Sequence, residues 1–324
     1  MTKAPTTSAM VPKFDSYYLD AIKASGVAET TKEQYIKCWK RLQRICDGKT
    51  IDYIMHHPKQ LRKHIEKHIP NEGTRKTTIN TILATFKYIG TVKSGSESYL
   101  EWYLMHTTLK NKLEEEAKDS IPKGRAAEGY IEWQDALAAE KQLADTQYGS
   151  RDHLCLAMYT HLAPRRQEDY YRTLIVTTAR MPPIHGYSAI LNLYETPPTL
   201  KVLQYKTVKT YDAWEKKLES PRFDSLLKII KHSLREQPRQ VLFAQADGTA
   251  YTLVESFTKF TNRVIKKHLG DKVTLNSIRH AASKASLTNA NKSLREQEQY
   301  AKDMGHSFTT HQLYRFKRPD SDVQ

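Results

Sequence analysis

The feature that most constrains the fold is a break in apolar periodicity at residues 118–129, KDSIPKGRAAEG. Before it, apolar residues recur with the 3.6-residue period of amphipathic helices. After it, short β-rich runs separated by Pro and Gly alternate with helical segments. A chain of 324 residues is long enough for two domains, each with its own core. We therefore expect a helical domain over residues 1–117, a linker over 118–129 and a second domain over 130–324.

The first domain is expected to be helical throughout residues 13–113. TTKEQYIKCWKRLQRIC opens with the capping-box pattern of Thr30 and Glu33, and a basic face lies opposite its apolar stripe. PKQLRKHIEKHI places Pro58 at a first helical position, and TRKTTINTILATFKYIG ends at Gly90 as a C-cap. The pattern predicts a small helical domain whose exposed faces are largely basic.

The second domain is expected to be mainly helical with a small antiparallel sheet. WQDALAAEKQLA, DHLCLAMYTHLA and FDSLLKIIKHSLREQ are helical in pattern, whereas TLIVTTA, AILNLYE and TLKVLQYK are short β-rich runs. No internal repeat at a solenoid period is apparent. The fold class predicted for the chain is therefore α+β.

The charge balance points to a polyanionic partner. The chain has 51 Lys and Arg against 36 Asp and Glu, a formal net charge of +15, and the basic residues recur along its whole length. Because phosphate neutralisation dominates nucleic-acid affinity, this favours a nucleic acid over a merely basic globular protein.

Other classes are disfavoured by the sequence. No apolar run approaches the ~20 residues needed to span a bilayer, and MTKAPTTSAMVPKFD lacks the apolar centre of a signal peptide. We expect an intracellular protein without a membrane partner. Cys38, Cys46 and Cys155 lack zinc-site spacing, so we expect reduced and mostly buried thiols.

Four short stretches hold the residues that could carry chemistry. They are APRRQEDYYRTL (163–174), LQYKTVKTY (203–211), TLNSIRHAASKAS (274–286) and MGHSFTTHQLYRF (304–316). Each is weak alone, but in this order they resemble the catalytic domain of tyrosine recombinases, the integrase family related to type IB topoisomerases. The resemblance covers roughly residues 150–316. It implies an N-terminal core-binding domain and a catalytic domain that close around duplex DNA.

Two arginines are candidate phosphate clamps. The family's Arg-x-x-acid pattern fits Arg166 with Asp169, and Arg165 with Glu168 fits nearly as well, so Arg166 is preferred and Arg165 stays an alternative. Arg279 matches the arginine of the His-x-x-Arg pattern. A guanidinium suits the role because its planar fork donates two hydrogen bonds to phosphate and keeps its charge. The plain alternative for the first pair is an ion pair at a helix end.

The resemblance makes a lysine the general acid and departs from the family at one position. Lys206 is the better match for the hairpin lysine and Lys209 the alternate, although lysines at a hairpin edge also discourage strand pairing. Asn276 stands where the family pattern has histidine. An amide can hold a phosphate oxygen but cannot accept a proton as imidazole does. General-base help from Asn276 is therefore not expected.

The last stretch supplies a histidine and a tyrosine. The resemblance assigns His306 to the phosphate and Tyr314 to nucleophilic attack. A phenol, with its ordinary pKa near ~10, needs cationic neighbours to become a good nucleophile. His280 is expected to pack or to make a supporting hydrogen bond. His311 is expected on the helix surface.

The resemblance implies a reaction that needs neither cofactor nor metal. Tyr314 would attack a DNA phosphate to form a 3′-phosphotyrosyl link, and a 5′ hydroxyl would reverse the step. The sequence contains no P-loop and no acidic cluster typical of catalytic Mg²⁺. The expected assembly is a homotetramer on two synapsed double-stranded DNA sites and a monomer without DNA. Only ten residues, RFKRPDSDVQ, follow Tyr314, which leaves little chain for exchange between protomers.

Three other interpretations remain open at this stage. One is a topoisomerase that only relaxes supercoils. Another is a catalytically inert DNA-binding protein of the same fold, which Asn276 supports, and the third is a nuclease or an RNA-binding protein. APRR and YKTVKTY resemble recombinases of eukaryotic DNA viruses and mobile elements, which would place the protein in a host nucleus.

Overall fold

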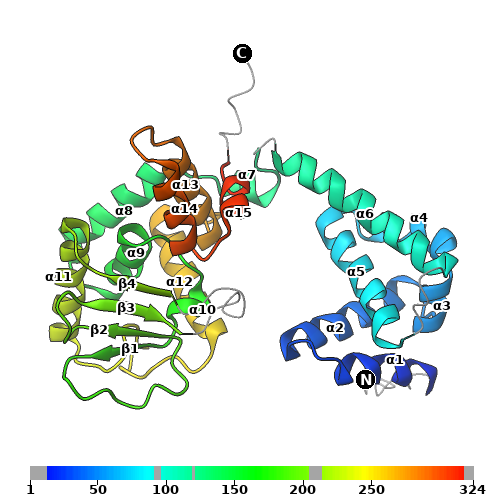
Figure 1. The fold of residues 1–324 in the computed structure, drawn as a ribbon, viewed down its shortest axis with the longest axis horizontal. Coiled ribbons are helices and arrows are strands. Elements are labelled where there is room, and N and C mark those ends of the chain that lie inside the picture. Colours follow the sequence, from blue (N-terminus) through cyan, green and yellow to red (C-terminus); the bar gives the residue numbers. More distant parts are fainter. Residues whose placement is uncertain (1–12, 91–95, 119–120, 204–213, 317–324) are drawn as a thin grey trace, which may run out of the picture. The chain divides into compact units, whose positions relative to one another are not determined.

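The computed structural model describes residues 13–90, 96–118, 121–203 and 214–316 (Figure 1). The chain divides into two compact units, Met1–Asp119 and Ser120–Gln324. The stretch that we expected to be a linker, 118–129, contains a short helix, α7 (Arg125–Glu128), that belongs to the second unit. Within the described ranges, no helix is both long and apolar enough to cross a membrane.

The first unit consists of helices around a core that includes two tryptophans. Trp39 and Trp102 are fully buried, and each indole N–H donates a hydrogen bond, to Thr85 Oγ1 and to the Met55 carbonyl, both at 2.9 Å. The apolar stripes expected from the sequence form this core. The helices are α1 (Lys13–Ala24), α2 (Glu29–Ile45), α3 (Ile51–His56), α4 (Pro58–His68), α5 (Glu72–Tyr88) and α6 (Glu97–Lys118).

The helix ends agree with the sequence patterns in part. Pro58 is the first residue of α4, as predicted, and Gly90 follows the end of α5 with a φ of +66°. The capping box expected at Thr30 is wrong, because α2 begins at Glu29 and Thr30 lies inside the helix. The N-cap, Ala28, has no side chain that can cap.

The second unit has the predicted α+β fold, with a four-stranded sheet packed against helices. The strand order is β1-β2-β3-β4. We expected an antiparallel sheet, but it is mixed: β1 pairs with β2 in parallel, with Thr173 opposite Ala189, and the other two pairings are antiparallel. Residues 177–188, between β1 and β2, are long enough to bring the chain back to the end of the sheet where β1 begins, as a parallel pairing requires. The strands are β1 (Thr173–Val176), β2 (Ala189–Asn192), β3 (Thr199–Val202) and β4 (Trp214–Lys217).

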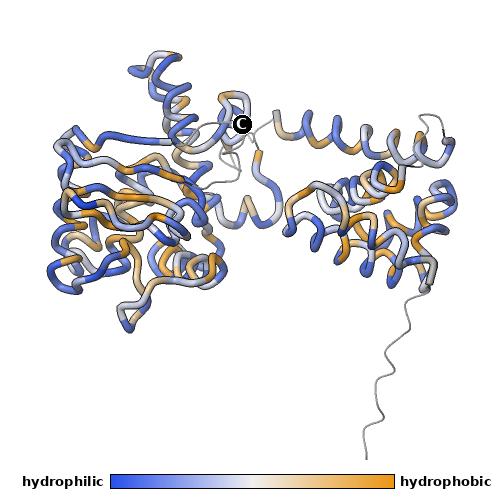
Figure 2. Tube along the Cα trace, turned by 60° about the horizontal axis from the view of Figure 1, so that its bottom comes forward, coloured by the Kyte–Doolittle hydropathy of each residue, from blue (hydrophilic) through white to orange (hydrophobic). Residues whose placement is uncertain are grey.

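The helices of the second unit surround one apolar core that also includes side chains of the sheet. Figure 2 shows hydrophobic and hydrophilic positions alternating along the helices, as expected for amphipathic segments. Cys46 and Cys155 are buried free thiols and Cys38 is half-buried. Besides α7, the helices are α8 (Trp133–Thr146), α9 (Arg151–His161), α10 (Gln167–Tyr170), α11 (Pro221–Glu236), α12 (Val254–Leu269), α13 (Leu275–Thr288), α14 (Leu294–Asp303) and α15 (Phe308–Leu313).

Candidate active site

Arg279 on α13 joins two turns that are distant in sequence. Its side chain is only 1% exposed. Nη1 donates to the Pro164 carbonyl at 2.7 Å, and both terminal nitrogens lie 3.4 Å from the Met304 carbonyl. Because a guanidinium has a fixed fork of donors, these bonds set its orientation. Arg279 thereby fixes the turn after α9 against the turn before α15.

The adjacent arginines after α9 have opposite environments. Arg165 is fully buried, its Nε donates to Asp169 Oδ2 at 2.8 Å, and its guanidinium lies 4.7 Å from the centre of the Trp214 ring. Arg166 is half-buried, and its backbone is extended, with a ψ of 160°. Arg165 is thus part of the interior, whereas Arg166 keeps access to solvent.

The neighbourhood of Arg166 is shown by the groups that its charge affects. Burial is the main cause that lowers the pKa of Arg279 and of His306, and the positive charge of Arg166 lowers both pKa values further. Arg166 therefore lies within electrostatic range of both side chains, and Arg165 also lowers the pKa of Arg279. The structure places Arg166, the preferred candidate, at the site and Arg165 beneath it.

The turn between α14 and α15 places His306. Gly305 has a φ of +72°, and a Cβ there would lie 3.2 Å from Nη2 of Arg165, so both the backbone conformation and the close contact favour glycine. Arg279 donates to Nε2 of His306, which makes Nδ1 the protonated nitrogen. That Nδ1 is buried and has no hydrogen-bond partner among the described residues. Burial and the charge of Arg279 lower the pKa of His306 to about 3, so its imidazole is neutral near pH 7.

Tyr314 follows the last residue of α15 and completes the cluster. Its ring centre lies 4.4 Å from that of His306 and 5.8 Å from the guanidinium carbon of Arg279. The tyrosine is half-buried, so its ring is partly accessible. The structure therefore brings together four of the residues singled out in the sequence. They are Arg166, Arg279, His306 and Tyr314.

Two further histidines surround this cluster. His280 stacks on Tyr314, and its Nδ1 lies 2.9 Å from the Tyr314 carbonyl, in agreement with the expected packing role. The expectation for His311 is wrong: it is fully buried, and its Nδ1 lies 3.1 Å from Ser283 Oγ. Because α15 packs against α13 and α14, the face that carries His311 is turned inward.

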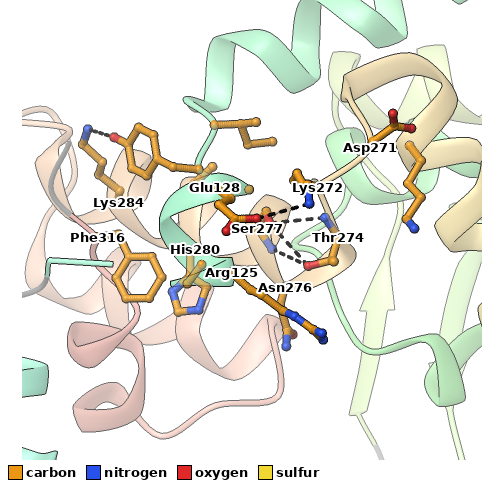
Figure 3. Close-up of a pocket in the computed structure, with 16 residues that line it drawn as sticks. Arg125, Glu128, Asp271, Lys272, Thr274, Asn276, Ser277, His280, Lys284 and Phe316 are labelled. Atoms are coloured by element: carbon orange, nitrogen blue, oxygen red, sulfur yellow. Dashed lines mark hydrogen bonds and ion pairs between the residues drawn. The ribbon is translucent and has the colours of Figure 1, made fainter. Parts of the chain in front are cut away.

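Asn276 is on the same helix as Arg279, and the cavity that it lines is also lined by His280. Asn276 is exposed, one turn before Arg279 and His280, and lines a cavity of about 680 Å³ (Figure 3). The N-terminal turn of α13 lines the cavity together with four basic side chains and two carboxylates, those of Glu128 and Asp271, and Lys272 pairs with Glu128 at 3.4 Å. A polar cavity of this kind can accept an anionic group next to the cluster.

The two candidate general acids, Lys206 and Lys209, lie outside the described residues, between β3 and β4 in the sequence. Asp303 holds β4, the strand that follows these lysines, to the site. Its carboxylate accepts from Trp214 Nε1 at 3.0 Å and from Lys216 Nζ at 2.9 Å, and its carbonyl accepts from Arg165 at 2.9 Å.

This link through Asp303 is absent from the sequence interpretation. The sequence places each partner near a candidate motif. Asp303 stands two residues before the Gly-His pair, and Trp214 follows the segment that contains the two lysines. Nothing in the spacing indicated that these residues are paired. The contacts fix β4 to the turn that carries His306.

Comparison with solved structures identifies the fold. The chain is similar to a lambda integrase dimer bound to a COC′ core site, with a TM-score of 0.61 and 11% sequence identity over 96% of this chain and 78% of that one. It is also similar to a lambda integrase tetramer bound to a Holliday junction, with a TM-score of 0.60 and 12% identity over 96% and 79% of the two chains. The second unit thus has an α+β fold like that of the lambda integrase catalytic domain, a tyrosine recombinase. No protein-family model matches the sequence, and no curated protein does.

The buried histidines predict acid sensitivity of the second unit. Burial lowers the pKa of His311 to about 4, below the ordinary value near 6.5. Between these two pKa values the unfolded chain binds more protons than the folded chain. The contribution of His311 to the free energy of unfolding is therefore fully present above pH ~6.5 and is lost as the pH decreases towards ~4. At pH ~5 this one histidine should cost about 2 kcal/mol of the free energy of unfolding.

The measurement compares His311→Gln with the unchanged protein. Hydrogen exchange of the α13 amides reports the opening of the second unit alone. Between about pH 7 and about pH 5, the variant should lose about 2 kcal/mol less than the unchanged protein. Replacing the exposed His185 by Gln should leave the pH dependence unchanged. An equal acid sensitivity of His311→Gln and the unchanged protein would exclude this histidine as a source.

Proposed function

We propose that the protein is a DNA strand-transferase, a site-specific tyrosine recombinase or integrase that breaks and rejoins duplex DNA through a 3′-phosphotyrosyl intermediate. The observation that carries the proposal is the approach of Tyr314 to His306 and Arg279, with Arg166 adding positive charge at both of these residues. These residues come from three separate stretches of the sequence and form one cluster. A half-buried phenol beside two permanent cations suits attack on a phosphodiester. The likeness to lambda integrase supports the fold that this chemistry requires.

The roles of the side chains follow from what each can donate. The Tyr314 hydroxyl gives its proton to solvent water, and its oxygen forms a bond to phosphorus while the bond from phosphorus to the 5′ oxygen breaks. Arg166 and Arg279 stabilise the charge that develops on the non-bridging oxygens. His306 is neutral near pH 7, so it can offer the phosphate a hydrogen bond but no positive charge. The donor would be its protonated Nδ1, which has no partner among the described residues. The leaving 5′ oxygen takes its proton from Lys206 or, as the alternate, Lys209.

Asn276 cannot serve as the general base of the proposed reaction. Its amide can hold a phosphate oxygen but cannot remove the Tyr314 proton. The proposed reaction therefore relies on the positive field of the arginines rather than on a base at residue 276. For the same reason an inert DNA-binding protein of this fold is the second candidate. It would bind duplex DNA and form no covalent species.

Covalent capture tests the proposal without a known target site. The full chain is incubated with a pool of nicked duplexes of random sequence, and DNA that survives denaturation on the protein is amplified over successive rounds. The proposal expects a covalent complex whose nucleotide-bearing peptide contains Tyr314 by mass spectrometry. Binding of the pool without any covalent species would support the second candidate instead. A requirement for a divalent metal would also contradict the proposal.

The proposal extends to the assembly on DNA. We expect a monomer in solution and a tetramer on two synapsed sites, in line with the neighbours, which are an integrase dimer and tetramer on DNA. The duplex that covalent capture yields allows the test, because sizing with and without it separates the two states. A stable tetramer without DNA would contradict this expectation. An origin in a DNA virus or mobile element, with action in a host nucleus, remains part of the proposal.

A further inference from the structure

Three stacked rings hold the end of α15 against α13. The imidazole of His280 is nearly parallel to the Tyr314 ring, with centres 4.3 Å apart and planes at 15°. It is also nearly parallel to the Phe316 ring, at 3.8 Å and 10°. Two rings cannot share one face of a third at such distances, so Tyr314 and Phe316 cover opposite faces of the imidazole. Figure 3 shows His280 and Phe316 side by side at the cavity.

The backbone of Tyr314 is held at the same point. Its carbonyl accepts from Nδ1 of His280 at 2.9 Å and from the Phe316 N–H at 3.1 Å. A carbonyl oxygen only accepts, so Nδ1 of His280 carries the hydrogen. Tyr314 directly follows the last helical residue of α15, where carbonyl groups lack partners within the helix. His280 thus supplies the partner that ends this helix.

We propose that His280 is the positioning residue of the candidate nucleophile, fixing the ring and the backbone of Tyr314 together, with Phe316 closing the outer face. This inference rests on the proposed function, in which Tyr314 attacks DNA. α15 has only six residues, too few to be stable without packing. Because attack depends on correct orientation of the reacting atoms, loosening the stack should lower the rate of attack and leave DNA affinity unchanged.

The geometry favours positioning by His280 over proton removal. The lone pair of its Nε2 lies in the imidazole plane, whereas the phenol hydrogen of Tyr314 lies close to the phenol plane. Two nearly parallel planes that are displaced from each other cannot bring that hydrogen onto that lone pair. A proton acceptor would need to lie within ~3.2 Å of the hydroxyl oxygen with suitable direction. Burial also lowers the pKa of His280 to about 4, which keeps the ring neutral near pH 7.

Hydrogen exchange tests the inference without DNA. In the full-length protein, His280→Ala should speed exchange of the amides of residues 308–316 by about tenfold or more, because two ring contacts and one hydrogen bond are lost. His280→Phe keeps a ring between Tyr314 and Phe316 and should give a smaller increase. His185→Ala, at an exposed histidine of the same unit, should give none. Unchanged exchange in His280→Ala would overturn the inference.

Single-turnover capture tests its consequence for the reaction. The probe is the nicked duplex recovered most strongly in the covalent selection. His280→Ala should slow adduct formation by about tenfold to about a hundredfold at saturating DNA, with affinity within about twofold, whereas His280→Phe should recover most of the rate. Added imidazole should not restore the rate of His280→Ala. Rescue by imidazole would overturn positioning, because it would identify a proton acceptor.

The two measurements also separate this inference from the proposed function. If the unchanged protein forms no adduct with any duplex, the proposed function fails, and the exchange rates still decide whether His280 holds Tyr314. If adduct forms and His280→Ala reacts at the unchanged rate, the proposed function stands and the inference fails.

Discussion

Replacement of Tyr314 by phenylalanine should abolish the covalent adduct and leave DNA binding within about twofold, because the variant loses only the attacking oxygen. The ring that stacks on His280 and faces His306 is retained, so the packing of α15 should be unchanged. Adduct formation should fall to background, a loss on the order of 10⁴ or more. The measurement is single-turnover capture on the nicked duplex, with affinity measured in parallel by gel shift.

Tyr130 provides the matched control for this variant. It lines the cavity next to the cluster, and its hydroxyl hydrogen bonds with Lys284 at 2.7 Å. Tyr130→Phe should form adduct at close to the unchanged rate. Adduct that persists in Tyr314→Phe and disappears in Tyr130→Phe would move the nucleophile to the other tyrosine and contradict the assignment of the site.

The sequence was informative where short-range patterns decide the structure. Apolar stripes of period 3.6 predicted the helices of the first unit, and the β-rich runs at residues 173, 189 and 199 correspond to β1, β2 and β3. The ordered motifs placed Arg166, Arg279, His306 and Tyr314 in one site, and the structure brings these side chains together. The sequence gives the spacing within each motif, whereas the fold brings the separate motifs next to one another.

What the sequence could not predict depends on contacts between distant segments. The parallel pairing of β1 with β2 depends on the path of residues 177–188, which has no local signature. His311 belongs to a helix of six residues, too short for a periodic pattern to indicate its buried face. The bonds of Asp303 to Trp214 and Lys216 join segments almost 90 residues apart, 303 against 214 and 216. Such contacts follow from packing, which composition and spacing do not specify.

The adjacent pair Arg165 and Arg166 shows the same limit and allows a decisive experiment. Both fit an Arg-x-x-acid pattern, and only burial separates them. Arg166→Ala should slow adduct formation by about a hundredfold to about a thousandfold, because one donor to the charge of the transition state is lost. Its effect on the free energy of unfolding should stay within about 0.5 kcal/mol, since the side chain is half-buried and at the margin of the core.

Arg165→Ala should show the opposite pattern. It leaves the buried carboxylate of Asp169 without its 2.8 Å partner and removes the contact with Trp214, which should cost about 3 to 5 kcal/mol of the free energy of unfolding. Denaturant unfolding followed by hydrogen exchange of the β1 and α13 amides measures this loss in the second unit. At a temperature where Arg165→Ala remains folded, its rate of adduct formation should fall less than that of Arg166→Ala. A stable Arg165→Ala protein that forms no adduct would instead assign the phosphate clamp to Arg165, because a residue with only a structural role should lower stability before it lowers the rate.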